Sequence, residues 1–207
     1  MPNQTRRTVH IADFADIGAV VLAAGPSTRL GKPKQLLQFR GQPLVRRAAS
    51  VAVEAGYKPV VVVTGAHAAA TREAVNGLDV QEAENEQWAT GMSSSIHVGV
   101  EAIVRASPQI AAIILMLCDQ PFVTGKLIAR LVAAHRETGC PIIASSYAGS
   151  YGVPALFGKE YFAELTKLEG AAGAKQLIQK RIAGVHLVDF PRGDIDIDTP
   201  DDLARLS

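Results

Sequence analysis

Short apolar runs alternate with helical patterns along almost the whole chain. The runs 18–23, 59–63 and 111–118 are rich in aliphatic residues, and 59–63 is nearly continuous valine, so we expect buried strands there. Alternation of strands with helices predicts a mainly parallel sheet between two helical layers, a three-layer α/β/α fold. The expected strands are 18–23, 59–63, 78–82, 111–118, 142–146, 153–157 and 185–190, and the expected helices are 43–55, 66–75, 91–106, 125–138 (capped by Thr124), 159–165, 172–182 and a short one from 199.

Composition limits the class of protein. Of the 207 residues, 48% are hydrophobic and 5% aromatic, which suits aliphatic strands covered by helices. The net charge of +1 and the absence of a long lysine–arginine block argue against a nucleic-acid partner. The sequence has neither an apolar run of transmembrane length nor a secretory signal, which predicts a cytoplasmic protein without a membrane partner. We expect a loosely ordered leader over 1–16 and a single domain over 17–207.

The two cysteines, Cys118 and Cys140, are not spaced as a metal or redox motif. Cys118 lies at the end of the most hydrophobic run of the chain. A small apolar thiol is commonly buried in such a place. We therefore expect both cysteines to be reduced core residues.

A glycine loop directly follows the first expected strand. Residues 22–34 read Leu-Ala-Ala-Gly-Pro-Ser-Thr-Arg-Leu-Gly-Lys-Pro-Lys. Small residues let the backbone approach a ligand, and exposed N–H groups bind phosphate oxygens. Arg29, Lys32 and Lys34 add positive charge, and no acidic residue occurs over 18–52. The loop is therefore predicted to bind a triphosphate rather than to be an ordinary surface turn.

This loop is neither of the two commonest phosphate loops. Five residues separate Gly25 from Gly31, and Pro33 stands where a Walker loop has its metal-binding hydroxyl. The dinucleotide fingerprint needs further glycines in the turn, where only Gly25 occurs. Because Pro33 discourages helix before it, the loop is expected to stay extended until about Gln35, with Lys34 on irregular backbone.

Other expected strand ends also carry candidate site residues, because ligands in open α/β sheets bind at the carboxyl ends of strands. Thr64 and Gly65 follow the second strand in a turn suited to a base or ribose. Asp119 follows the apolar run 113–117 and is interpreted as a ligand of a divalent cation. The alternative is a helix-capping aspartate, although Thr124 already caps the next helix.

Two more segments have open interpretations. Asp194, Asp196 and Asp198 would lie on one face of an extended segment, either as an acidic edge strand or as a source of a second metal ligand, with Asp198 best placed. The segment Gly91-Met-Ser-Ser-Ser95 opens an expected helix. Its serines could cap that helix or bind ribose hydroxyls and phosphate.

Taken together, these motifs resemble the MobA-like nucleotidyltransferases, and within them the molybdenum cofactor cytidylyltransferase branch. The resemblance spans about 18–206 and rests on Leu22-Ala-Ala-Gly…Arg29-Leu-Gly…Lys34, Gly91-Met-Ser-Ser-Ser, Cys118-Asp-Gln-Pro, Gly152-Val-Pro-Ala-Leu-Phe157 and Asp196-Ile-Asp-Thr-Pro200. It implies a Rossmann-like fold, mostly parallel with an antiparallel strand. It also implies magnesium-dependent transfer of CMP from CTP to the phosphate of molybdenum cofactor, with release of pyrophosphate.

The resemblance also implies roles for individual residues. Arg29, Lys34 and Asp119 are the expected catalytic residues, and Asp119 with Asp198 would bind magnesium. A molybdenum hydroxylase or its maturation factor is the implied protein partner. The expected nucleotide-binding residues are Leu22, Ala23, Ala24, Gly25, Arg29, Lys34, Thr64, Gly65, Gly91, Ser93 and Ser94.

One motif departs from the branch, which usually has Gly-Asp-x-Gly-Ala-Arg before its late helix. Here Ala171 replaces the aspartate and Lys175 the arginine, which removes a bidentate fork. The acceptor is therefore less well defined than the nucleotide. The alternatives are a cytidylyltransferase acting on another phosphorylated acceptor such as methylerythritol phosphate, a nicotinamide-dependent oxidoreductase, and a nucleotide-sensing protein.

Overall fold

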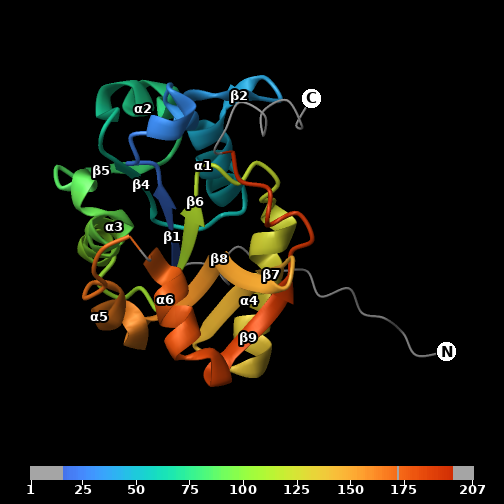
Figure 1. Cartoon of the computed structure of the whole chain (residues 1–207). Coiled ribbons are helices and arrows are strands. Elements are labelled where there is room, and N and C mark those ends of the chain that lie inside the picture. Colours follow the sequence, from blue (N-terminus) through green and yellow to red (C-terminus); the bar gives the residue numbers. More distant parts are fainter. Residues whose placement is uncertain (1–15, 172, 198–207) are drawn as a thin grey trace.

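A seven-stranded sheet forms the centre of the computed structural model, which describes residues 16–171 and 173–197 (Figure 1). The strand order is β5-β4-β1-β6-β8-β7-β9. β8 is antiparallel to both of its neighbours, and the other pairs are parallel. This confirms the predicted fold, including its antiparallel strand. The strands are β1 (Ile17–Leu22), β4 (Val60–Thr64), β5 (Gln81–Glu84), β6 (Ala112–Leu117), β7 (Ile142–Tyr147), β8 (Ser150–Gly158) and β9 (Val185–Asp189).

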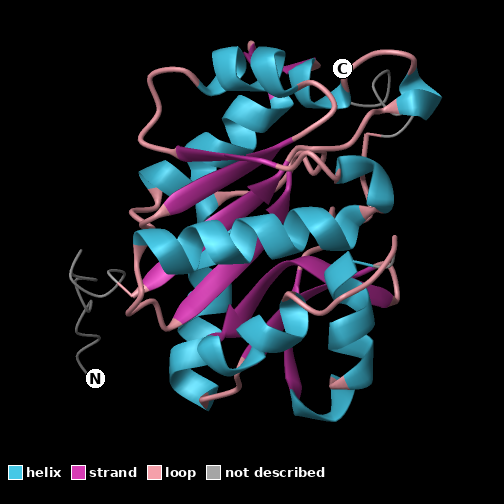
Figure 2. Ribbon diagram, turned by 90° about the vertical axis from the view of Figure 1, so that its left-hand side faces the viewer, coloured by secondary structure: helices cyan, strands magenta, loops and turns pink. Residues whose placement is uncertain are grey.

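Helices cover both faces of this sheet. α1 (Leu44–Glu54), α2 (Ala68–Val75) and α4 (Gly125–Thr138) pack on one face. α3 (Met92–Ala106), α5 (Phe162–Leu165) and α6 (Gly173–Lys180) pack on the other, where α3 crosses the strands (Figure 2). Because the central strands are buried on both faces, they consist of continuous aliphatic residues rather than an alternating pattern.

A short hairpin leaves the main sheet after β1. β2 (Gln38–Phe39) pairs with β3 (Gln42–Pro43), and Arg40 and Gly41 connect them. Both connecting residues have positive φ, 51° and 80°, which is the left-handed conformation that a tight two-residue hairpin requires. The hairpin extends from the edge of the sheet at which β1 ends, beside the start of α1.

The expected strand over 78–82 was placed too early, since β5 begins at Gln81. Leu78 and Val80 are apolar because they pack against the core from the turn after α2. β5 itself is an edge strand of sequence Gln-Glu-Ala-Glu, whose polar residues hid it. The late helix is also shorter than expected: α6 ends at Lys180, and a 3₁₀ turn, Ile182–Gly184, follows.

Two expectations at the ends of the chain fall outside the described residues. The leader expected over 1–16 is described only at Asp16, and the short helix expected from 199 is not described. Within the part that is described, none of the helices combines the length and the apolarity needed to cross a membrane.

Candidate active site

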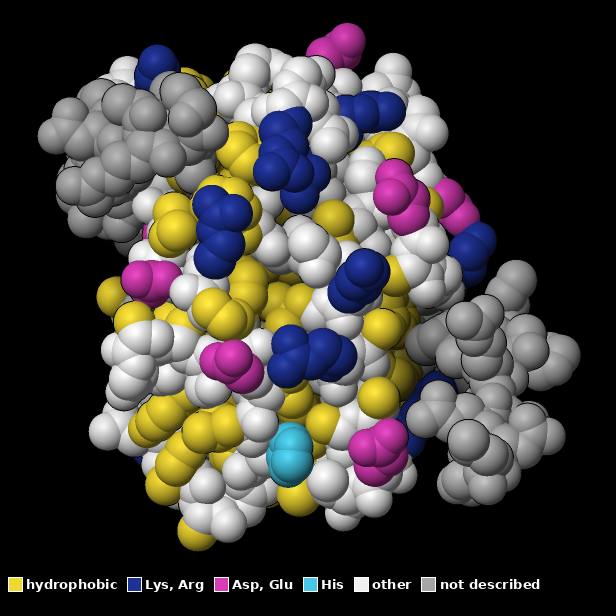
Figure 3. Space-filling model, turned by 90° about the vertical axis from the view of Figure 1, so that its right-hand side faces the viewer, with side chains coloured by type: hydrophobic (Ala, Val, Ile, Leu, Met, Phe, Trp, Pro, Cys, Tyr) yellow, Lys and Arg dark blue, Asp and Glu magenta, His cyan; other side chains and the backbone are white. Residues whose placement is uncertain are grey.

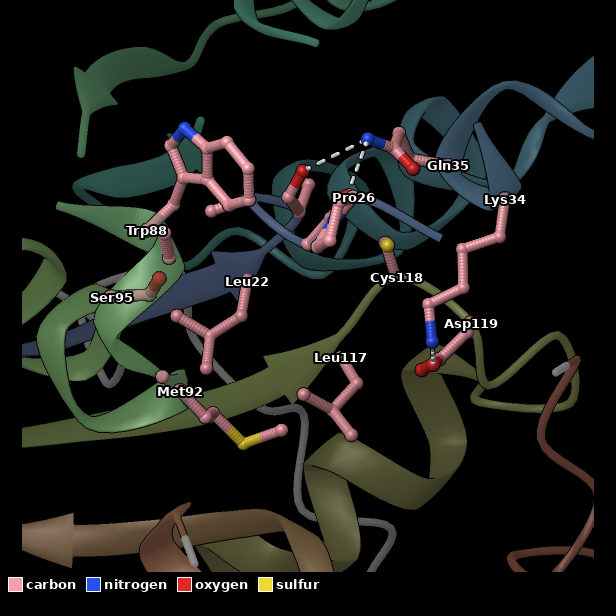
Figure 4. Close-up of a pocket in the computed structure, with 15 residues that line it drawn as sticks. Leu22, Pro26, Lys34, Gln35, Trp88, Met92, Ser95, Leu117, Cys118 and Asp119 are labelled. Atoms are coloured by element: carbon pink, nitrogen blue, oxygen red, sulfur yellow. Dashed lines mark hydrogen bonds and ion pairs between the residues drawn. The ribbon is translucent and has the colours of Figure 1, made fainter. Parts of the chain in front are cut away.

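A cavity of about 380 Å³ opens at the carboxyl ends of β1 and β6. The two strands are parallel neighbours, so the loops that follow them meet at the same edge of the sheet. The loop after β5 and the start of α3 close the other side (Figure 4). Its walls are formed by Leu22, Ala23, Ala24, Gly25, Pro26, Lys34, Gln35, Trp88, Ala89, Gly91, Met92, Ser95, Leu117, Cys118 and Asp119.

One end of the cavity is apolar. Leu22, Leu117 and Met92 gather at this end, with the indole of Trp88 above them (Figure 4). Ser95 adds a hydroxyl to the same wall, and this hydroxyl accepts a hydrogen bond from Asn85 Nδ2 (2.9 Å). A flat ring with a few polar edge atoms is the kind of ligand that such a wall suits.

The other end of the cavity is ionic. Nζ of Lys34 donates to Oδ2 of Asp119, and the two side chains are 23% and 9% exposed. Oδ1 of Asp119 is buried and accepts no hydrogen bond from any described residue. A buried carboxylate oxygen without a partner is costly unless a cation or donor occupies the space before it. Asp119 therefore fits a ligand of a divalent cation, for which oxygen donors are preferred.

The second predicted metal ligand, Asp198, lies outside the described residues. Among the residues that are described, no group of three acidic, histidine or cysteine side chains is close enough together to hold a metal ion. Among the residues that the structure describes, Asp119 is therefore the carboxylate that lines the ionic end of the cavity.

The glycine loop is more ordered than predicted. Instead of staying extended, it forms two 3₁₀ turns, Thr28–Leu30 and Lys34–Leu36. Pro33 keeps an extended ψ of 107° and precedes the second turn, so proline ends one segment and starts the next. The hydroxyl of Ser27 accepts a hydrogen bond from the Lys34 N–H (2.9 Å), which closes the loop on itself.

Gln35 supports this loop from inside. Its side chain is 1% exposed, and Nε2 donates to the carbonyls of Ala23 (3.4 Å) and Gly25 (3.3 Å). Gln35 thereby holds the backbone of the glycine loop in place at the cavity wall. Gln35, Trp88, Met92 and Leu117 were not predicted as site residues, and Ser95 was considered only as one of the three serines that open the helix. The signal for Gln35 was an uncharged polar side chain directly after Lys34, at the end of the glycine loop.

The predicted residues of the second strand end have supporting positions. The hydroxyl of Thr64 is buried and donates to Glu82 Oε1 (3.0 Å). A Cβ on Gly65 would lie 2.8 Å from Ala24 Cβ and 2.9 Å from Trp88 Cβ. Neither residue is part of the cavity wall. Gly65 instead allows the glycine loop and the Trp88 segment to approach each other.

The serines at the start of α3 divide between two cavities. Gly91 lines the first cavity and is the N-cap residue, so the serines do not cap the helix. Ser93 and Ser94 line a second, more polar cavity of about 590 Å³. The Ser93 hydroxyl donates to the Gly170 carbonyl (2.7 Å), and the Ser94 hydroxyl donates to the Gly91 carbonyl (2.8 Å).

Two further predicted residues have limited descriptions. The backbone of Arg29 lies in the first 3₁₀ turn of the glycine loop, and its side chain is outside the described part. Lys175, which replaces the usual arginine, is on α6, where Nζ donates to the Ser150 hydroxyl (2.8 Å). Ala171 is exposed.

Both cysteines are free, as expected. Cys118 is buried in the cavity wall, and its burial together with the neighbouring charge of Asp119 raises the pKa of the thiol to about 12. The thiol is therefore neutral at physiological pH and is a poor nucleophile.

The fold and this cavity together define a protein of the Rossmann-like nucleotidyltransferase class. The model of the MobA-like NTP transferase domain matches residues 19–185, and the chain belongs to this family. Among its relatives, the nicotine blue oxidoreductase of Paenarthrobacter nicotinovorans is 30% identical over 206 residues, which cover 94% of this chain and 98% of that protein.

Solved structures share this fold over nearly the whole chain. Rv0371c from Mycobacterium tuberculosis H37Rv aligns with a TM-score of 0.77 at 33% identity, covering 93% of this chain and 97% of that one. Another structure of Rv0371c, in complex with manganese, has a TM-score of 0.74 at 32% identity and covers 93% of this chain and 98% of that one. A chain similar over nearly its whole length therefore forms a complex with manganese.

Proposed function

We propose that this protein is a magnesium-dependent nucleotidyltransferase that moves CMP from CTP to the phosphate of molybdenum cofactor and releases pyrophosphate. The observation that carries the proposal is the ionic end of the cavity, where Lys34 and the unpartnered Oδ1 of Asp119 lie opposite an apolar wall. Such a site offers a cation for phosphate, a carboxylate for a metal ion and a surface for a base.

In this proposal, each part of the cavity has one task. The backbone of residues 22–25 and the side chain of Ser95 contact the nucleotide, with its base against Leu22 and Trp88. Lys34 and Arg29 oppose the charge of the triphosphate. Asp119, with Asp198, holds magnesium, which when bound neutralises charge on the phosphates. The proposal keeps Thr64 and Gly65 as nucleotide-binding residues through the loops that they support. It keeps Ser93 and Ser94 in this role from the second cavity, which adjoins the first at the start of α3.

The proposed reaction is a direct displacement at phosphorus. An oxygen of the acceptor phosphate forms a bond to the α-phosphorus of CTP, while the bond from that phosphorus to the α–β bridging oxygen breaks. Pyrophosphate leaves with the electron pair. The acceptor phosphate is already ionised at neutral pH, so no general base is required, which agrees with a cavity wall without histidine among the described residues.

The proposal includes a cytoplasmic location and transfer of the product to a molybdenum hydroxylase or its maturation factor. The acceptor is its least supported part, because Ala171 and Lys175 replace the residues usual in that branch. Another phosphorylated acceptor, such as methylerythritol phosphate, would use the same nucleotide end of the cavity.

An oxidoreductase is the second candidate function. The nicotine blue oxidoreductase is 30% identical to this chain and is matched over nearly its full length. The apolar end of the cavity could also hold the flat ring of a dye or of a nicotinamide cofactor. The glycine fingerprint of dinucleotide binding is absent from the loop after β1, which favours the transferase.

A ligand panel separates these candidates. The melting temperature is measured with CTP, GTP, ATP or UTP, each with magnesium, and with NADPH, and pyrophosphate release is then followed with each acceptor. We expect CTP to stabilise the protein most and pyrophosphate to appear only when molybdenum cofactor is added. Stabilisation by NADPH without any response to nucleoside triphosphates would contradict the proposal and support the oxidoreductase. Nucleotide binding without turnover on any acceptor would support a sensor.

A further inference from the structure

Three arginines gather around two phenylalanine rings beside the candidate active site. We call Phe39, Arg40, Arg47, Phe122 and Arg192 the arginine–phenylalanine cluster. The two rings meet edge to face, with centroids 5.7 Å apart and planes at 82°. Cζ of Arg40 and of Arg47 lie 5.2 Å and 5.3 Å from the Phe39 centroid, and Cζ of Arg192 lies 3.2 Å from that of Phe122. Each guanidinium is thus within cation–π range of a ring.

Four separate segments bring this cluster together. Phe39 and Arg40 belong to the β2–β3 hairpin, and Arg47 to α1. Phe122 follows β6, and Arg192 follows β9, whose carboxyl end lies at the same edge of the sheet as that of β6. Figure 3 shows lysine and arginine side chains next to exposed hydrophobic ones on one face of the molecule. The positive charge therefore results from tertiary packing and not from a basic stretch of sequence.

No carboxylate among the described residues forms an ion pair with any of the three arginines. The carboxylates of Asp194 and Asp196, shortly after Arg192, lie near Tyr147, where burial and their charges raise the pKa of the phenol. Burial is the main cause that lowers the pKa of Arg47, the nearby charge of Arg40 lowers it further, and the charge of Glu54 acts in the opposite direction. Arg40 and Arg47 therefore repel each other, besides the cost of burying Arg47. An anion bound to the cluster would relieve this repulsion.

The backbone presents Arg40 outward at some cost. Arg40 has a φ of 51° at the tip of the hairpin, a conformation that asparagine or glycine adopts more easily. Arg40 and Arg192 are both exposed, whereas Phe39, the ring over which Arg40 lies, is 6% exposed. Arg40 therefore occupies a strained turn position while it stacks on the buried ring of Phe39. Such strain is typical of functional positions, because folding stability alone would favour asparagine or glycine there.

We propose that the arginine–phenylalanine cluster is the docking surface for a carboxylate-rich segment of a partner protein. The guanidinium groups stack on two differently oriented rings, so they offer several separate forks rather than one pocket for a single anion. An acidic segment with several carboxylates satisfies them together. Arginine and aromatic side chains are also the residues enriched at the centres of protein interfaces.

The cluster is linked to the candidate active site by one hydrogen bond. Nε of Arg47 donates to the carbonyl of Pro121 (2.8 Å), two residues after Asp119, and no described residue accepts from its terminal nitrogens. A partner docked on the cluster is therefore held next to the turn that carries Asp119. This inference does not depend on which nucleotide or acceptor the cavity takes.

The test uses the full chain and a fluorescein-labelled peptide of ten glutamates as the probe. Fluorescence anisotropy at 0.15 M NaCl measures binding to the wild type and to a double charge reversal, Arg40→Glu with Arg192→Glu. Arg47 is left unchanged because its hydrogen bond supports the Asp119 turn. Arg105→Glu is the matched control, since this exposed arginine is near the far end of α3.

We expect the double variant to weaken peptide binding at least about tenfold, because lost charge-assisted hydrogen bonds are each worth about that factor. Arg105→Glu should change binding by less than about twofold. The melting temperature and the response to CTP with magnesium should be unchanged in both variants, which separates this inference from the proposed function. Absence of binding by the wild type, equal binding by the double variant, or binding only after residues 198–207 are removed would each overturn the inference. The last result would assign the surface to the chain's own C-terminal segment, which carries Asp198, Asp201 and Asp202.

Discussion

Lys34 donates to Oδ2 of Asp119 across 85 residues of sequence, joining the loop after β1 to the turn after β6. The other oxygen of Asp119 accepts no hydrogen bond from a described residue. One carboxylate therefore has an internal cation on one side and a buried, unpartnered oxygen on the other. In the proposed function, Lys34 neutralises Asp119 in the free protein, and it would bind the triphosphate when the Asp119 carboxylate holds a metal ion.

Replacing Asp119 with asparagine should abolish metal-dependent activity while preserving the fold. The amide keeps the shape of the side chain but has no negative charge for a metal ion. We expect pyrophosphate release to fall at least about 100-fold, because charge stabilisation by a metal ion is worth several kcal/mol. Asp79→Asn is the control, since this exposed carboxylate pairs with Lys58 away from the cavity wall. Equal activity of Asp119→Asn and the wild type would show that Asp119 is not the metal ligand.

Lys34→Met should make the protein dependent on divalent metal for stability. The substitution leaves the largely buried Asp119 carboxylate without its lysine, at a cost of about 1–3 kcal/mol, less than for a fully buried pair because Lys34 is 23% exposed. Adding manganese should recover most of this loss, so the shift in melting temperature with manganese should be larger than for the wild type. Lys32→Met, in the same loop but exposed, should behave like the wild type. If manganese shifted the melting temperatures of Lys34→Met and Lys32→Met equally, Lys34 would not be the cation that neutralises Asp119.

Gly65→Ala should disturb the cavity without touching it. The new Cβ would lie 2.8 Å from both Cβ and the carbonyl oxygen of Ala24, a backbone neighbour that yields only by moving the glycine loop. We expect a loss of about 1–3 kcal/mol of stability and weaker nucleotide binding. Gly125→Ala, at the first position of α4 with Ala55 Cβ 3.9 Å away, should cost little. Unchanged nucleotide affinity of Gly65→Ala would show that Gly65 does not set the loop position.

The stability of the protein should fall as the pH rises above about 9, through Cys118. Burial and the charge of Asp119 raise the pKa of this thiol from 9.0 to about 12. The unfolded chain then releases the thiol proton at a lower pH than the folded protein, so the contribution is complete below pH 9 and is lost above it. The slope should approach about 1.4 kcal/mol per pH unit for this one group. Urea unfolding of the wild type and of Cys118→Ala between pH 8 and 11 measures the difference, and identical slopes would contradict the prediction.

The fold and the ionic end of the site could be predicted because their signals are local. Aliphatic runs of strand length marked β1, β4 and β6, and parallel pairing places their carboxyl ends at one edge. Asp119 was predicted as a site residue because it directly follows an aliphatic run. Lys34 was predicted because it is one of the cations of the glycine loop. β5 was placed too early because an edge strand can be polar, whereas the turn before it supplies apolar residues to the core.

The sequence alone determined the order along the chain of the main-sheet strands and the larger helices, but not the β2–β3 hairpin. It also determined the chemistry of the loop after β1 and the carboxylate after β6, since these depend on local composition and on strand periodicity. Only the tertiary structure decided which side chains share a space. Ser95 faces the first cavity while Ser93 and Ser94 face the second, because neighbouring residues on a helix point about 100° apart and packing sets the rotation of α3. The arginine–phenylalanine cluster likewise exists only because four distant segments meet at one edge of the sheet.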